Sequence, residues 1–62
     1  MNKIRVYVLI DPHGKPNANF TAHFAYMVRH EAVLGFSHEG VKEWKDLYKY
    51  GWRVKPATLI LK

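Results

Sequence analysis

The chain has 62 residues and no cysteine, which excludes disulfide bonds and thiolate zinc sites. Hydrophobic residues make up 48% of the chain, too many for a disordered tail, so we expect one small folded domain over residues 1–62. The formal charge of +5 favours an anionic partner, such as nucleic acid, an acidic protein face or a membrane surface.

Residues 4–10, with the sequence IRVYVLI, predict a central β-strand. The run is rich in β-branched residues and places apolar side chains on both faces, as in a strand with neighbours on either side. The DPHG segment that follows has the proline and glycine positions of a type I turn. The apolar part of the run, 6–10, is too short for a signal peptide or a membrane span, so we expect a cytoplasmic protein without membrane contact.

Residues 19–30, with the sequence NFTAHFAYMVRH, fit two structures. Apolar and polar residues alternate and a turn precedes them, so we interpret the segment as the second strand of a hairpin. Phe20, Phe24 and Met27 also fit a helical stripe, which leaves a helix as the alternative. The next segment, EAVLGF, fits either a short helical turn or an extension of the strand.

Residues 38–50 predict the main helix. Ser37 is a favourable N-cap, and Glu39 lies in the first turn, where the helix dipole favours an acid. Gly51 fits the C′ position that ends a helix. The predicted buried arc of this helix consists of Val41, Trp44, Leu47 and Tyr48.

Residues 52–62, with the sequence WRVKPATLILK, predict the third strand. Apolar and basic side chains alternate over 52–55, and Pro56 marks a sheet edge or a bulge because it cannot donate a ladder hydrogen bond. Together the elements predict an α+β fold, in which a small three-stranded sheet carries one amphipathic helix on one face, in the order β-β-α-β.

Aromatic and basic side chains are interleaved over residues 42–55, KEWKDLYKYGWRVK. Stacking platforms for single-stranded nucleic acid need outward-pointing rings, whereas we expect Trp44, Tyr48 and Trp52 to face the core. The remaining side chains form a surface that is either merely solvated or contacts phosphates. This candidate binding rim consists of Lys42, Lys45, Lys49, Tyr50, Arg53 and Lys55.

No constellation of residues indicates a reaction. The chain has no glycine-rich phosphate loop, and its single serine is the predicted helix cap. The histidines are never three or four residues apart, so they form no helical metal pair. We therefore expect no enzymatic activity, no cofactor and no metal. The histidines are His13, His23, His30 and His38.

Residues 47–54, LYKYGWRV, resemble the helix–glycine–tryptophan–strand junction of HicA-type RNA-cleaving toxins. Those toxins carry a histidine soon after this junction, whereas no histidine follows Gly51 here. A small RNA-cleaving toxin that uses histidines is therefore a third alternative, for which we assign no catalytic residue.

The leading hypothesis is a small non-enzymatic binding protein that occupies a surface of a larger protein. The high aromatic content and the apolar strands whose edges need cover favour this class. Small basic proteins of this kind are frequent among phage and mobile-element accessory proteins that inhibit or redirect host machinery. A nucleic-acid-binding module that uses the candidate rim is the alternative.

A homodimer is expected because the chain is short. A chain of this length buries only about 60% of the surface that it exposes when unfolded. Without disulfides, oligomerisation is the reinforcement that remains. The candidate dimer contacts lie in the two apolar runs that a single helix cannot cover: Phe20, Phe24, Tyr26, Val28, Leu59 and Leu61.

Overall fold

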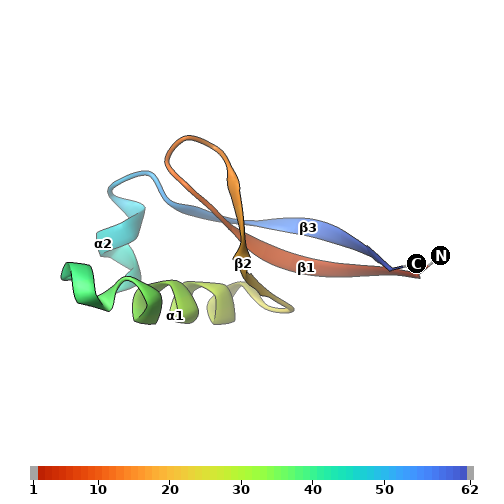
Figure 1. Cartoon of the computed structure of the whole chain (residues 1–62), viewed down its shortest axis with the longest axis horizontal. Helices are drawn as coiled ribbons and strands as arrows, with labels where there is room; N and C mark the ends of the chain where they lie inside the picture. The colour runs from red at the N-terminus through yellow and green to blue at the C-terminus, as the bar shows by residue number, and fades with distance from the viewer. Residues whose placement is uncertain (1, 62) are drawn as a thin grey trace.

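The structure is a computed structural model that describes residues 2–61. Its elements are β1 (Asn2–Ile10), β2 (Pro16–Ala22), α1 (Ala25–Gly35), the 3₁₀ helix η1 (Ser37–Glu39), α2 (Trp44–Tyr48) and β3 (Arg53–Leu61). The strands form one antiparallel sheet in the order β2-β1-β3. α1 lies along one face of the sheet, and α2 lies at the end away from both termini (Figure 1). The small α+β fold with a central first strand is therefore confirmed.

The sheet continues past the helices as a two-stranded ribbon. β1 and β3 pair along their whole length, from Asn2 opposite Leu61 to Ile10 opposite Arg53. β2 pairs with β1 only from Tyr7 to Ile10. Residues 2–6 and 57–61, which we call the arm, therefore extend beyond β2 as a two-stranded ribbon, with Val6 still buried at its base (Figure 1). The arm makes the molecule elongated, with extents of 41 × 20 × 15 Å.

An irregularity in β2 turns one aromatic side chain toward the helices. The register jumps between Val8, which lies opposite Thr21, and Leu9, which lies opposite Asn17. The intervening segment of β2 thus bulges, and the ring of Phe20 stacks on that of Phe36 with 5.9 Å between centroids.

The core is small and draws on the sheet and both α-helices. Its buried centre consists of Leu9 from β1, Val28 and Ala32 from α1, and Leu47 from α2. Val28 and Ala32 are one helical turn apart, so they face the same layer. Partly buried apolar side chains surround this centre: Tyr7, Phe20, Ala22, Phe36, Val41, Trp44, Trp52 and Val54.

The predicted second strand is wrong beyond Ala22, because the chain forms α1 from Ala25 onward. Ala25 and Ala32 have high helix propensities, and α1 buries Val28 and Ala32 at helical spacing. The alternation would place Tyr26 inward, yet it is 63% exposed. A short apolar run fits both the alternating pattern of a strand and the spacing of a helix. Packing against the sheet selects the helix here.

The predicted main helix over 38–50 is also wrong. Gly40 adopts a left-handed conformation with φ of 90°, and Glu43 is extended, so only Trp44–Tyr48 forms an α-helix. Ser37 does not cap this helix, because its hydroxyl donates to the carbonyl of Leu34 at 2.9 Å. The main helix of the fold is instead α1.

The predicted role of Gly51 is confirmed. Gly51 has φ of 105°, a conformation that favours glycine. Its N–H donates to the carbonyl of Tyr48 at 3.0 Å, and the N–H of Trp52 donates to the carbonyl of Leu47 at 3.3 Å. This pair of bonds is a Schellman motif, which satisfies carbonyls that the end of α2 leaves open.

The predicted turn and edge proline are confirmed too. The Gly14 N–H donates to the carbonyl of Asp11 at 2.9 Å, which closes the turn between β1 and β2. The Asp11 carboxylate also accepts the backbone N–H groups of His13 and Lys15. Pro56 lies in β3, which is an edge strand of the described sheet.

Candidate functional site

The outward side of α1 is largely apolar. Tyr26, Met27 and Leu34 are 63%, 41% and 55% exposed, opposite the side that packs on the sheet. Phe24, just before the helix, is 57% exposed, and its ring stacks on that of Tyr26 with centroids 5.8 Å apart. We call this surface the α1 patch; it consists of Phe24, Tyr26, Met27, His30, Glu31 and Leu34.

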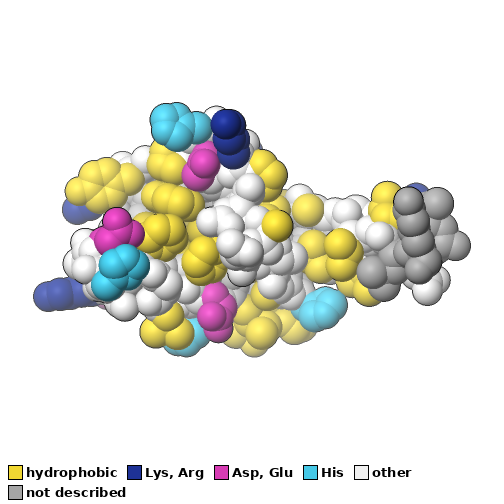
Figure 2. All heavy atoms as spheres, viewed as in Figure 1, with side chains coloured by type: hydrophobic (Ala, Val, Ile, Leu, Met, Phe, Trp, Pro, Cys, Tyr) yellow, Lys and Arg dark blue, Asp and Glu magenta, His cyan; other side chains and the backbone are white. Residues whose placement is uncertain are grey.

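The α1 patch contains an open hollow of about 480 Å³, lined by Tyr26, Met27, His30 and Glu31. Hydrophobic side chains reach the surface along the helical side of the molecule and on the arm (Figure 2). Exposed apolar surface of this kind is typical of protein contacts, in which aromatic residues and methionine are enriched. Its chemistry therefore suits the apolar surface of another protein.

The predicted dimer contacts lie in different environments. Val28 is only 1% exposed and Phe20 stacks within the chain, so both pack inside the molecule. Phe24 and Tyr26 belong to the α1 patch. Leu59 is 46% exposed on the arm. The side chain of Leu61 lies outside the described part of the structure.

The predicted basic rim does not form a helical ridge. Lys42 precedes α2 and Lys49 follows it, because this helix has only five residues. The Lys45 ammonium lies 3.1 Å from the Glu43 carboxylate, which offsets its charge. Lys55 is exposed on β3, and Tyr50, at 69%, is as exposed as expected.

Asp46 organises the start of α2. Its carboxylate accepts the backbone N–H groups of Lys42 and Glu43, each at 3.0 Å. These bonds hold the pKa of the Asp46 carboxyl below its usual value. A hydrogen bond from Lys45 to Glu43 raises the pKa of the Lys45 ammonium.

The expectation that Tyr48 faces the core is wrong, because Tyr48 is 52% exposed. The guanidinium carbon of Arg53 lies 3.8 Å from the centroid of its ring. Because it faces outward, the Tyr48 ring gains little stabilisation from burial, and it is stabilised instead by cation–π attraction to Arg53. Trp44 and Trp52 are half-buried and pack against the core, as predicted.

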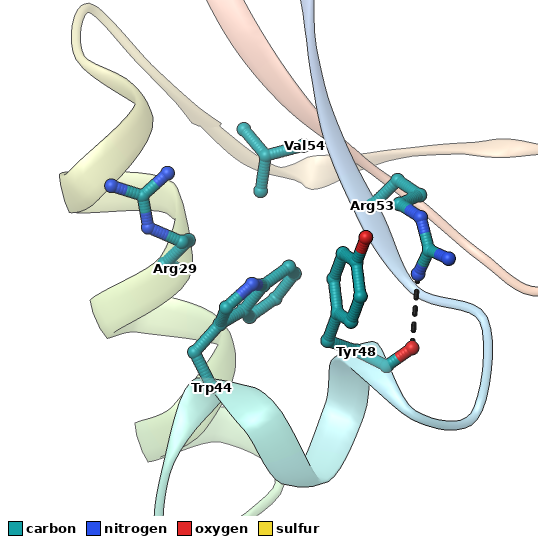
Figure 3. A pocket seen from close by; sticks show the side chains of 5 residues that line it. All are labelled: Arg29, Trp44, Tyr48, Arg53 and Val54. Carbon is teal, nitrogen blue, oxygen red and sulfur yellow. Dashed lines mark hydrogen bonds between the residues drawn. The ribbon is translucent and has the colours of Figure 1, made fainter.

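A small pocket lies between α1, α2 and β3, with Arg29 beside Trp44 and Arg53 beyond the ring of Tyr48 (Figure 3). The pocket holds about 160 Å³ and is lined by Arg29, Trp44, Tyr48, Arg53 and Val54. Sequence reasoning missed Arg29 and this pocket, because only the packing of α1 against α2 and β3 brings the lining residues together. No local pattern in the sequence signals that packing.

Comparison of the chain with family models, curated proteins and solved structures finds no match. Within residues 2–61, no group of three or more histidine, aspartate or glutamate side chains is placed to hold a metal ion. The described helices include none that is long and apolar enough to cross a membrane.

Proposed function

We propose that this chain is a small non-enzymatic binding protein that acts in the cytoplasm by covering a surface of a larger protein. The α1 patch is the observation that carries the proposal. A helix that presents Tyr26, Met27 and Leu34 outward leaves apolar area in water, and an apolar surface on a partner would remove that area from water.

The partner chemistry that fits this surface is apolar at its centre and acidic at its rim. The chain carries a formal charge of +5, and Lys42, Lys49 and Lys55 are exposed. Opposite charge on the partner would accelerate association, while burial of the α1 patch would slow dissociation. A protein that acts in this way inhibits or redirects its partner by occupying a surface, as accessory proteins of phages and mobile elements do.

Site-specific photo-crosslinking tests the proposal. A photoreactive residue at position 26 should give one reproducible protein adduct in native host cells. The same residue at position 13, in the exposed turn between β1 and β2, serves as the control. The adduct identifies the partner, which is then purified for binding measurements.

Binding of the purified partner then decides the role of the α1 patch. The double variant Tyr26→Ser, Met27→Ser should bind at least about tenfold more weakly than the parent, since exposed aromatic residues are frequent hot spots. The control variant His13→Ser should bind like the parent. Equal affinity for the double variant, or equal crosslinking from both positions, would reject the α1 patch as the binding surface.

Nucleic-acid binding through the candidate rim is the second candidate, favoured by the exposed side chains of Lys42, Lys49 and Lys55. Affinity for generic DNA or RNA would then fall steeply with salt concentration. The triple variant Lys42→Gln, Lys49→Gln, Lys55→Gln would flatten this dependence. If an electrophoretic mobility shift assay shows no binding at physiological salt, nucleic-acid binding through the candidate rim is excluded.

A further inference from the structure

Both strands of the arm have an open edge. β3 is an edge strand of the described sheet, so none of the described strands lies beyond residues 57–61. β2 pairs with β1 only from Tyr7 to Ile10, so residues 2–6 of β1 have an open edge as well. Figure 1 shows the outer part of the arm with no further element beside it. An open edge exposes backbone N–H and C=O groups with which another strand can pair.

The two open edges differ in charge. The segment ATLIL, residues 57–61 of β3, has no charged side chain. Residues 2–6 of β1 include Lys3 and Arg5, and both are exposed. Charged side chains, and lysine above all, commonly protect a strand edge against pairing with another copy. The β3 edge therefore lacks the protection that the β1 edge has.

Pro56 indicates which backbone groups of β3 face outward. Proline is tolerated in an edge strand where its nitrogen faces away from the neighbouring strand. In an antiparallel strand the N–H and C=O of one residue point to the same side, and successive residues alternate. β3 pairs with β1 without a register shift, so this alternation continues from Pro56 along the arm. Thr58 and Ile60 therefore turn their backbone groups toward the open edge, whereas those of Leu59 face β1.

We infer that the β3 edge pairs with β3 of a second copy, antiparallel, about a two-fold axis at Leu59. Thr58 of each copy then lies opposite Ile60 of the other and exchanges both backbone hydrogen bonds with it. The two Leu59 side chains face each other on one side of the sheet, next to Ile4, which lies opposite Leu59 within each chain. Pro56 cannot donate a hydrogen bond, so the pairing ends there. This contact uses none of the residues of the α1 patch.

Burial favours this contact. Leu59 and Ile60 are 46% and 52% exposed in the single chain, and each gains a neighbour across the axis. Cross-strand pairs of β-branched residues, such as Thr58 with Ile60, stabilise an antiparallel sheet. A third and a fourth strand also support a ribbon that is only marginally stable with two.

Charge separates this contact from the pairing of two β1 edges. In a β1–β1 pair about Ile4, Lys3 of one copy would lie opposite Arg5 of the other, about 5 Å away, and like charges directly opposite each other are destabilising. In the β3–β3 pair the same two charges lie on the outer strands of the joined sheet, three strand spacings or about 14 Å apart. This separation exceeds the Debye length of about 8 Å at physiological salt, so the repulsion is largely screened.

The pairing closes after two copies. The joined arms form a sheet with the strand order β1-β3-β3-β1, and its outer edges carry Lys3 and Arg5. A two-fold axis covers the same edge of both copies, so no uncharged β3 edge remains for a third copy. The occupant is therefore one second copy, and the assembly does not grow into an open series.

Disulfide trapping tests the register. The chain has no cysteine, so an introduced cysteine reports only on its own position. Leu59→Cys should form at least about tenfold more disulfide between copies than Lys3→Cys in a glutathione buffer, because facing residues of a non-hydrogen-bonded pair lie within disulfide reach. A mixture of Thr58→Cys and Ile60→Cys chains keeps Leu59, and it should give more mixed disulfide than random pairing predicts.

Other outcomes of the trapping overturn the proposal. If Lys3→Cys forms the disulfide as readily as Leu59→Cys, the copies do not meet at the β3 edge. If Tyr26→Cys forms it more readily than Leu59→Cys, the copies meet at the α1 patch. If the mixture of Thr58→Cys and Ile60→Cys chains reaches only the random proportion of mixed disulfide, the register about Leu59 is wrong.

A proline at the open edge tests the pairing without a disulfide. Thr58→Pro removes an N–H that faces solvent in the single chain, so circular dichroism should show the parent's fold. The dissociation constant of its dimer, from sedimentation equilibrium, should rise at least about tenfold because both copies lose a donor. Thr58→Val keeps the N–H and should associate like the parent. An unchanged constant for folded Thr58→Pro, or a parent that remains a 7.3 kDa monomer, would overturn the proposal.

Discussion

Two glycines in the turns of this fold have backbone angles that other residues rarely adopt. Gly14 and Gly51 both have positive φ, 85° and 105°, in the turns that precede β2 and β3. They differ in their surroundings. A Cβ added to Gly14 would meet open space, whereas one added to Gly51 would lie 3.2 Å from the Cβ of Pro12. Position 51 therefore requires glycine for two reasons: its backbone conformation and its closeness to Pro12.

This difference predicts which of two glycine substitutions destabilises the protein more. Gly14→Ala should lower the free energy of unfolding by about 1–2 kcal/mol, because an L-residue pays for the left-handed conformation. Gly51→Ala should cost more, since the new methyl group also crowds Pro12 and weakens the Schellman bonds. Urea denaturation of both variants measures the two losses. An equal or smaller loss for Gly51→Ala would contradict the contact with Pro12.

At the scale of elements, the Asp46 carboxylate caps the start of α2. Asp46 accepts the N–H groups of Lys42 and Glu43, and its pKa is lowered as a result. A carboxyl whose folded pKa lies below its unfolded value stabilises the fold above the unfolded pKa, about 3.9. That stabilisation is lost as the pH falls through the lower, folded pKa.

A low pH therefore lowers the stability of the parent more than that of a variant without the Asp46 carboxylate. Asp46→Asn should melt at a lower temperature than the parent at neutral pH, and the difference should narrow as the pH falls below about 4. Thermal melts followed by circular dichroism across this range measure the effect. Glu31→Gln, which removes an exposed carboxylate from α1, should leave the parent's acid dependence in place. A pH-independent gap for Asp46→Asn would reject the capping role.

The first and third strands were predictable from sequence, whereas the extents of β2 and of the helices were not. β1 and β3 follow from β-branched runs and from turn residues, which act locally. The helices depend on features that local sequence patterns do not show. Gly40 and the extended Glu43 interrupt the predicted helix, and the segment after Ala22 changes period where the sheet ends. The pocket lined by Arg29, Trp44 and Arg53 was beyond prediction, because only the packing of α1, α2 and β3 brings these residues together.

At the scale of the whole molecule, the outer part of the arm carries apolar side chains that a single chain leaves exposed. β2 does not reach residues 2–6 of β1, and Leu59 and Ile60 are 46% and 52% exposed. An isolated two-stranded ribbon is only marginally stable in water, and an open strand edge is a template for another chain. The α1 patch adds further apolar surface away from the core.

A homodimer is therefore the expected state, with a two-fold axis that covers the same surface of both copies. Sedimentation equilibrium at micromolar concentration should give a mass near twice the 7.3 kDa of one chain. Leu59→Ser should shift the equilibrium toward the monomer, because it removes apolar area from the arm. Lys55→Ser, on the same strand, is the control and should leave the mass unchanged. A single species of 7.3 kDa for the parent would contradict the dimer, and the arm would then be stable through its pairing within one chain.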